Sequence, residues 1–123
     1  MLATQENVKI ERMDDYVVIK IEKGQKLHKT ANDIVTALAS IANGQEKEAL
    51  LDISSIVNMT KQDEDLIKQI DRMAMNLKIG ISLINPKYNV RNYIRNSKLN
   101  ERVPTFDTIQ QYNSARQGKY YDA

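Results

Sequence analysis

The sequence predicts one α/β domain, in which helices cover a small mixed β-sheet. Three observations support this fold class. The length of 123 residues suits a single domain, and 41% hydrophobic with 28% charged residues is ordinary for a globular protein. Residues 49–53 form a short apolar run that is typical of a buried strand. Amphipathic helical patterns alternate with short strand patterns, which gives the order β-β-α-β-α-β-α-β-α.

The first two elements are predicted to be strands. Residues 7–13 and 16–22 each alternate apolar and polar side chains, as a strand with one buried face does. Only Asp14 and Asp15 separate the two runs, and so short a gap predicts an antiparallel hairpin. Gly24 then leads into a polar connection.

The first helix is expected to begin at Thr30, whose hydroxyl would cap the first turn, and to end at Asn43. Ile34, Leu38 and Ile41 recur at helical spacing and form its apolar stripe. This stripe predicts that one face of the helix packs against the sheet.

Residues 49–53 (ALLDI) are expected to form the central strand, because a nearly continuous apolar run indicates burial on both faces and parallel neighbours. A second helix should begin at Thr60, which forms a pattern resembling a capping box with Asp63. Its expected buried stripe consists of Leu66, Ile67, Ile70, Met73, Ala74 and Leu77.

The second half continues the alternation. Residues 78–84 alternate as a strand, and residues 87–97 have the periodicity of a third helix. Residues 102–106 are expected to form a short edge strand, since they contain Pro104 and proline is tolerated only at an edge or an end.

A last helix is expected from a cap at Asp107 to about Gln117, followed by a tail over residues 118–123. The single domain of residues 1–123 would then have its core at about residues 7–117. The sequence shows neither an internal repeat nor a linker.

The composition excludes several chemistries. Without cysteine there is no thiolate nucleophile or ligand, and one histidine excludes a multi-histidine metal centre within the chain. The four glycines are scattered, so no glycine-rich phosphate loop exists. The acidic residues 63–65 suit the positive end of a helix and do not converge as catalytic carboxylates. We therefore expect no catalytic residue, no metal and no cofactor.

Charge and hydropathy limit the location and the partners. The net charge is only +2, which does not favour nucleic acid, although residues 77–123 carry eight basic and three acidic side chains. No apolar run approaches the roughly 20 residues of a membrane span, and the first residues lack a secretory signal pattern. We expect a cytoplasmic protein that does not act on a membrane surface.

The loop after the expected central strand is the first candidate site. Open α/β sheets place functional groups where such a strand leads into a helix. Three hydroxyls and several apolar side chains gather there, and a helix N-terminus would favour a phosphate. An ordinary turn followed by a helix cap is the structural alternative. The candidate partner-binding or phosphorylation residues are Ser54, Ser55, Ile56, Val57, Met59 and Thr60.

The third helix is the second candidate. Lys87, Arg91 and Arg95 follow at intervals of four residues, and Lys98 continues the basic stripe. Such a stripe can attract an acidic protein or an anionic ligand. A solvated helix face is the alternative explanation. Only two tyrosines lie near the stripe, so support for nucleic-acid binding through base stacking is weak.

The segment LLDISSIVNMT, followed by a helix with an acidic first turn, is similar to the "LDLSGVxxMDSSG" region of STAS domains, the family of anti-sigma-factor antagonists. The downstream strand KIGISLINP, the helix YNVRNYIRNSKLN and the segment VPTF fit the same family. The chain resembles the SpoIIAA-like bacterial proteins still more closely, over about residues 16–115.

This resemblance implies a non-enzymatic module with one mixed sheet and helices mainly on one side. In signalling members, a partner kinase phosphorylates a serine or threonine after the central strand, and this switches protein binding. When Met59 is aligned with the motif methionine, the acceptor position falls on Gln62, which cannot accept phosphate. Only a one-residue slip would make Thr60 the acceptor.

The expected function is that of a regulatory module that binds a protein partner, such as an anti-sigma factor or a kinase, through the loop. Ile56, Val57 and Met59 should then be exposed on one patch. The alternative is a carrier of a lipid or small anionic ligand, with an apolar cleft between the second and third helices and Arg91 or Arg95 at its mouth. A homodimer is compatible with either function.

Overall fold

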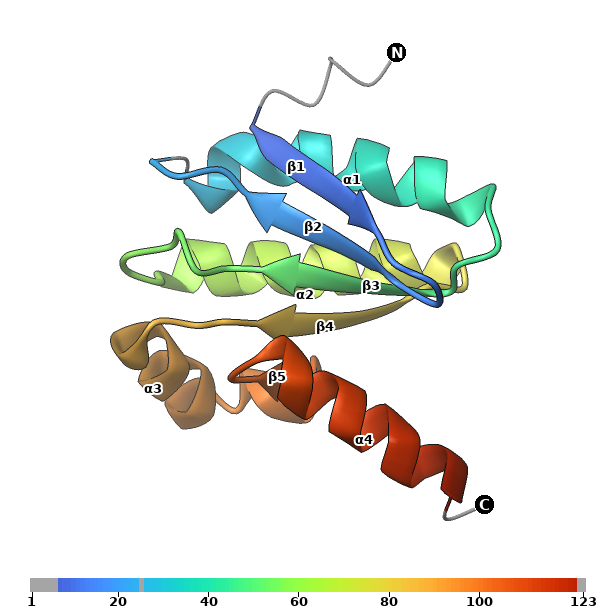
Figure 1. Ribbon diagram of the computed structural model, residues 1–123. Helices are drawn as coiled ribbons and strands as arrows, with labels where there is room; N and C mark the ends of the chain where they lie inside the picture. Colours follow the sequence, from blue (N-terminus) through green and yellow to red (C-terminus); the bar gives the residue numbers. More distant parts are fainter. Residues whose placement is uncertain (1–6, 25, 122–123) are drawn as a thin grey trace.

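The computed structural model describes the backbone of residues 7–24 and 26–121, and their side chains as far as Arg116. Its sheet has the strand order β1-β2-β3-β4-β5 (Figure 1). The hairpin of β1 (Val8–Arg12) and β2 (Val17–Ile21) is antiparallel. β3 (Glu48–Asp52), β4 (Gly80–Ile84) and the edge strand β5 (Thr105–Phe106) are parallel to β2. The predicted hairpin, the central parallel strand and the short edge strand are confirmed.

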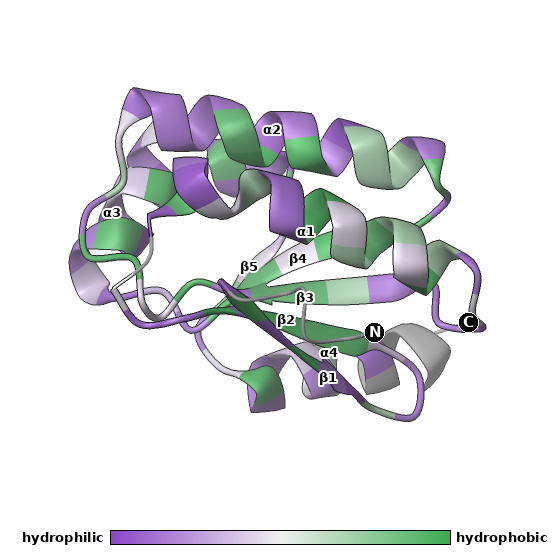
Figure 2. Cartoon of the chain, turned by 90° about the horizontal axis from the view of Figure 1, so that it is seen from above, coloured by the Kyte–Doolittle hydropathy of each residue, from purple (hydrophilic) through white to green (hydrophobic). Residues whose placement is uncertain are grey.

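The helices lie mainly on one face of the sheet, as predicted. Figure 2 shows α1 (Leu27–Ala42) and α2 (Lys61–Asn76) side by side over the sheet, with α4 (Ile109–Tyr121) on the opposite face. α3 (Tyr88–Ser97) follows β4 and buries Val90 and Ile94 in the main core. A short 3-10 helix, η2 (Leu99–Glu101), connects α3 to β5.

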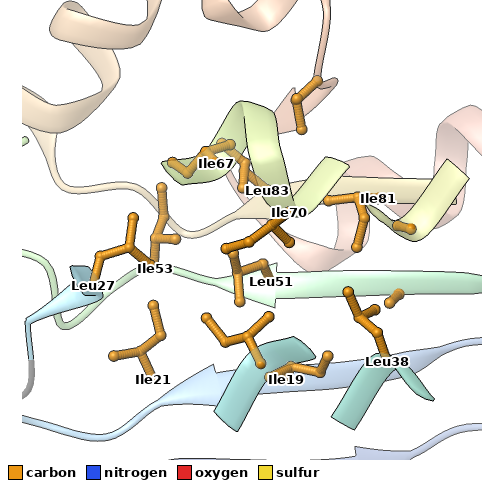
Figure 3. Packing of buried hydrophobic residues seen from close by; sticks show 14 of the residues in the cluster. Ile19, Ile21, Leu27, Leu38, Leu51, Ile53, Ile67, Ile70, Ile81 and Leu83 are labelled. Carbon is orange, nitrogen blue, oxygen red and sulfur yellow. The ribbon is translucent and has the colours of Figure 1, made fainter. Parts of the chain in front are cut away.

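The core has two parts because β3 is covered on both faces. Leu51 of β3 is buried in the main cluster between the sheet and α1, α2 and α3 (Figure 3). Its neighbour Leu50 is buried in the smaller cluster beneath α4, which includes Tyr16 and Tyr112. Successive side chains of a strand point to opposite faces, so the middle of a central strand with two cores, residues 49–51 here, must be apolar.

α1 begins three residues before the predicted start. Lys26 is its N-cap and makes no side-chain cap bond, whereas Thr30 lies inside the helix and its Oγ1 donates to the Leu27 carbonyl at 3.0 Å. Leu27 is only 2% exposed. Its burial in the core extends the helix towards the N-terminus, and the threonine hydroxyl is satisfied by the preceding turn.

The stripe predicted for α2 is partly wrong. Ile67, Ile70 and Ala74 are buried, but Met73 is 42% exposed and Leu77 is 36% exposed. The buried face is narrower than a six-residue apolar stripe. It includes buried polar residues, and their partners, some beside them in α2 and some elsewhere in the chain, permit this burial. The buried polar residues of α2 are Asp63, Glu64 and Asp71.

α4 also differs from the prediction at both ends. Thr108 is positioned as its cap, because Thr108 Oγ1 accepts a bond from the Gln111 amide at 3.1 Å. The Asp107 carboxylate instead binds Arg91. The helix continues to Tyr121, beyond the predicted end at Gln117. The predicted tail therefore begins inside a helix, and residues 122–123 lie outside the described residues.

The capping box predicted for α2 is present. Thr60 Oγ1 accepts from the Asp63 amide at 3.2 Å, and the Thr60 amide donates to Asp63 Oδ2 at 3.0 Å. Thr60→Ala should lower the free energy of unfolding by about 1 kcal/mol, measured by urea denaturation. Thr60→Ser keeps the hydroxyl and is the matched control. Equal stability of the two variants would show that the cap does not stabilise the helix.

Candidate functional site

The candidate site is a cleft of about 810 Å³ at the end of the sheet where β2 and β3 finish. The carboxyl ends of parallel strands meet at one edge, so the loops that follow them face each other. Residues of the β2–α1 turn form one wall, and residues 54–58 with the first turn of α2 form the other. Lys87, the N-cap of α3, completes the rim.

Asp52 holds the loop that forms one wall of this site. Its side chain is 8% exposed at the end of β3. Asp52 Oδ1 accepts from the Ser54 amide at 2.9 Å, and Oδ2 accepts from Asn85 Nδ2 at 3.2 Å. Asn85 has a φ of +61°, a backbone conformation that asparagine tolerates better than most residues. The loops after β3 and β4 are thus joined by one buried carboxylate.

The predicted loop residues divide into a group that is at least partly exposed and a group that is buried. Ser54, Ser55 and Thr60 line the cleft, and Val57 is 63% exposed. The expectation of a common exposed patch is wrong for Ile56 and Met59, which are 5% and 7% exposed and belong to the main core. The turn closes with a bond from the Ile56 amide to the Ile53 carbonyl, and the two buried side chains anchor it.

A contact to α3 holds the exposed part of the loop. Asn89 Nδ2 donates to the Val57 carbonyl at 2.6 Å and to Asn58 Oδ1 at 3.0 Å. The neighbouring Tyr88 is 72% exposed. Sequence reasoning did not single out Asn89 as a contact. The apolar–polar pattern indicated the helix but carried no signal for a bond between residues 32 positions apart.

The basic stripe of α3 is not gathered at the cleft. Lys87 lines it, but Arg91 binds Asp107 at 3.0 Å and lies 5.4 Å from the centre of the Tyr88 ring. Arg95 and Lys98 are exposed near the C-terminal end of α3. The alternative function, a carrier of a lipid or small anionic ligand, predicts a cleft between the second and third helices. The observed cleft instead lies between the starts of α1 and α2, and neither Arg91 nor Arg95 lines it.

Glu64, just inside α2, forms a buried polar contact with α3. It is 4% exposed, and its Oε1 accepts from the Tyr93 hydroxyl at 2.9 Å. Lys68 Nζ lies 3.2 Å from its Oε2. Burial alone would raise the pKa of Glu64, but the bonds from Tyr93 and Lys68 and the nearby lysine charges outweigh it and lower this pKa. Burial, followed by the bond to Glu64, raises the pKa of Tyr93.

From the sequence alone, Glu64 is an acid that suits a helix N-terminus. The structure gives it a second role, as the anchor of α3 on α2.

Within residues 7–24 and 26–121, no three histidine, aspartate or glutamate side chains are arranged to hold a metal ion. The same part of the chain contains no helix that combines the length and the apolar character needed to cross a membrane.

No family model matches the chain, and no curated protein matches it. Solved structures do. A putative anti-sigma factor antagonist from Thermotoga maritima aligns with a TM-score of 0.71 at 16% identity, covering 90% of this chain and 95% of that one. A serine-to-glutamate variant of RsbS from Moorella thermoacetica gives 0.66 at 23% identity, with coverage of 90% and 99%.

The Bacillus cell fate determinant SpoIIAA in its phosphorylated form gives a TM-score of 0.60 at 15% identity, covering 88% of this chain and 98% of that one. The predicted resemblance is therefore confirmed at the level of the fold: the chain has the fold of anti-sigma-factor antagonists.

Proposed function

We propose that this protein is a regulatory module that binds a protein partner through residues 54–60 and the start of α2. It shares its fold with anti-sigma-factor antagonists over most of its length. The partner would be an anti-sigma factor or a kinase, by analogy with these proteins. Its action would be binding and not catalysis.

One observation carries this proposal: two exposed apolar side chains lie on segments that are joined by hydrogen bonds. Val57 and Tyr88 are 63% and 72% exposed. Asn89, the residue after Tyr88, donates to the Val57 carbonyl, so the hydrogen bond links the two segments that carry these side chains. A protein interface needs a few exposed apolar or aromatic anchors on a surface that changes little on binding. Tyr88, and not the buried Ile56 or Met59, is thus the second exposed side chain that we expect to contact the partner.

The hydroxyls of the site differ as acceptors of a regulatory phosphate. Thr60 uses its hydroxyl in the cap of α2, and a phosphate there would lie against the Asp63 carboxylate. Ser54 is partly exposed on one wall of the cleft, and lysines line the opposite wall and the rim. We therefore expect any phosphate on protein purified from its own host to be on Ser54. Peptide mass spectrometry reports the position, and a phosphate on Thr60 would contradict this assignment.

Site-specific photocrosslinking in the host tests partner binding. A benzophenone amino acid replaces Val57 in one strain and Met75 in another. Met75 is 64% exposed near the other end of α2, so it is the matched control. We expect the probe at position 57 to capture a discrete second protein that the probe at position 75 does not. Mass spectrometry of the crosslinked band identifies it.

Binding of the purified partner then gives the quantitative result. Val57→Glu should weaken the affinity at least about tenfold, because a charge would be buried in the interface. Met75→Glu should change it less than about twofold. Equal effects of the two variants, or capture of only a second copy of this chain at position 57, would overturn the proposal.

A further inference from the structure

The strand β1 leaves one edge of the sheet open. Within the part of the chain that the structure describes, no strand pairs with its outer side (Figure 1). The opposite edge strand, β5, has only two residues and directly follows Pro104. Short strands and prolines protect a sheet edge from further pairing. β1 has five residues and no proline, so of the two edges it is the one able to accept another strand.

The hydrogen bonds between β1 and β2 show which backbone groups of β1 face outward. Just beyond β1, the Met13 amide donates to the Tyr16 carbonyl at 2.9 Å. Bonded and non-bonded residues alternate along an antiparallel pair, so the odd-numbered residues of β1 bond to β2. Val8, Ile10 and Arg12 therefore direct their amides and carbonyls towards the open edge.

Two charges of opposite sign lie along this edge. Lys9 and Glu11 are exposed and share one face of β1, and neither forms an ion pair with any described residue. The strand register places Lys9 opposite Lys20, and Glu11 opposite Val18. Like charges directly opposite each other on neighbouring strands are unfavourable. The sheet itself therefore places no charge of opposite sign directly across from either side chain.

We propose that two copies of this chain associate by antiparallel pairing of their β1 strands, centred on Ile10. In this register Val8 faces Arg12 of the second copy and the two Ile10 residues face each other, so the outward amides and carbonyls bond across the contact. Lys9 then lies directly opposite Glu11 of the second copy, in the more closely spaced type of pair. The partly exposed side chains of Ile10 contact each other on the opposite face.

The charges favour this register over its neighbours. A slip of one residue would bring outward backbone groups opposite groups that already bond to β2. A slip of two residues keeps the backbone bonds but brings Lys9 opposite its own equivalent, or Glu11 opposite its own equivalent, which is unfavourable. Charged side chains on an edge strand usually hinder pairing. Here their signs alternate so that a second copy in one register satisfies both.

The contact is limited to two copies. It uses the β1 edge of both chains, and the remaining edge of each is the protected strand β5, so the assembly is a two-fold dimer and not a fibre. Neither residues 54–60 nor α3 belongs to this edge. The inference therefore goes beyond the proposed function and does not rest on it.

Sedimentation velocity of the full chain over a range of concentrations tests the dimer. A contact along one strand edge is small, so we expect a Kd of about 10–100 µM. Lys9→Glu and Glu11→Lys should each weaken association about tenfold or more, because each variant places like charges opposite each other twice in the dimer. An equimolar mixture of the two variants should associate as the parent does, since each supplies the charge that the other lacks.

Arg72→Glu is the matched control for these variants. It makes the same change in net charge at an exposed position on α2, and it should alter the Kd less than about twofold. The edge variants should remain folded, because both positions are exposed and Lys9→Glu places an acid opposite Lys20. Thermal melting followed by circular dichroism checks this.

A disulfide reports the register, because the chain has no cysteine of its own. Lys9→Cys and Glu11→Cys are prepared separately and then mixed in a glutathione redox buffer. In the mixed dimer the two introduced thiols lie directly opposite each other, close enough for a disulfide, and one Lys9–Glu11 pair is kept. We expect a disulfide-linked dimer in the mixture and much less of it in either variant alone.

Three results would overturn the proposal. The first is a parent protein that stays monomeric up to about 1 mM. The second is a mixture of Lys9→Glu and Glu11→Lys that associates no better than either variant alone. The third is a disulfide that forms equally in the mixture and in the separate cysteine variants. Failure of the crosslinking experiment at Val57 would leave all three measurements unaffected, so the two proposals fail separately.

Discussion

Ile53→Ala should lower the free energy of unfolding by about 2–5 kcal/mol, measured by urea denaturation monitored by circular dichroism. Ile53 directly follows β3, is fully buried in the main core, and lies near Leu27 in Figure 3. Its amide donates to the Ile84 carbonyl at 3.1 Å, which holds the backbone in place. The substitution would therefore leave a cavity that the surrounding chain cannot easily fill.

Val57→Ala is the control for this experiment. It removes apolar atoms from the same loop at a position that is 63% exposed, so its cost should stay below about 0.5 kcal/mol. The contrast tests the division of the loop into buried anchors and an exposed contact surface. A loss below about 1 kcal/mol for Ile53→Ala would show that the site tolerates the cavity and that the loop is not anchored as described.

The strands and the order of the elements could be predicted because apolar spacing records which face is buried. Leu50 and Leu51 illustrate this point. Consecutive apolar residues at positions 49–51 indicate two cores, and the structure has one core on each face of β3. The residues at which the helices begin and end were less predictable. Thr30 looked like a cap, but the burial of Leu27 extends α1, and no local pattern reports that tertiary contact.

The candidate site was predictable in position but not in detail. The end of a central strand is where α/β folds place functional loops, so residues 54–60 could be singled out. Which of their side chains are exposed depends on tertiary packing, and Ile56 and Met59 are buried by it. The basic cleft joins Lys20, Lys26 and Lys87 from separate segments. Helical spacing instead favoured Arg91, which binds Asp107.

The hydrogen bond between Glu64 and Tyr93 is the clearest contact that composition and spacing did not reveal. Its removal is the second substitution for which we expect a large loss of stability. Glu64→Ala should lower the free energy of unfolding by about 1–3 kcal/mol, because the Tyr93 hydroxyl loses its acceptor in a half-buried position. Asp65→Asn removes a charge from the next position, where the side chain is 54% exposed. Its cost should stay within about 0.5 kcal/mol.

The pKa of Glu64 predicts how this stability depends on pH. Folding lowers this pKa below its ordinary value of 4.5, so the folded state binds the proton less readily than the unfolded state does. The contribution of ionised Glu64 is thus complete above pH 4.5 and is lost as the pH falls through the lower pKa of the folded state. The parent should therefore lose stability as the pH falls below 4.5, and Glu64→Gln should have a flatter profile in that range.

Urea denaturation of both proteins between pH 7 and pH 3 separates this effect from a simple loss of packing. Glutamine keeps an acceptor for Tyr93 and a similar shape but cannot titrate. If the two proteins lost stability in parallel below pH 4.5, the ionised carboxylate of Glu64 would not be what stabilises the contact between α2 and α3. α3 supplies both Tyr93, which bonds to Glu64, and Asn89, which bonds to the Val57 carbonyl. Weakening the contact between α2 and α3 should loosen the proposed partner surface as well.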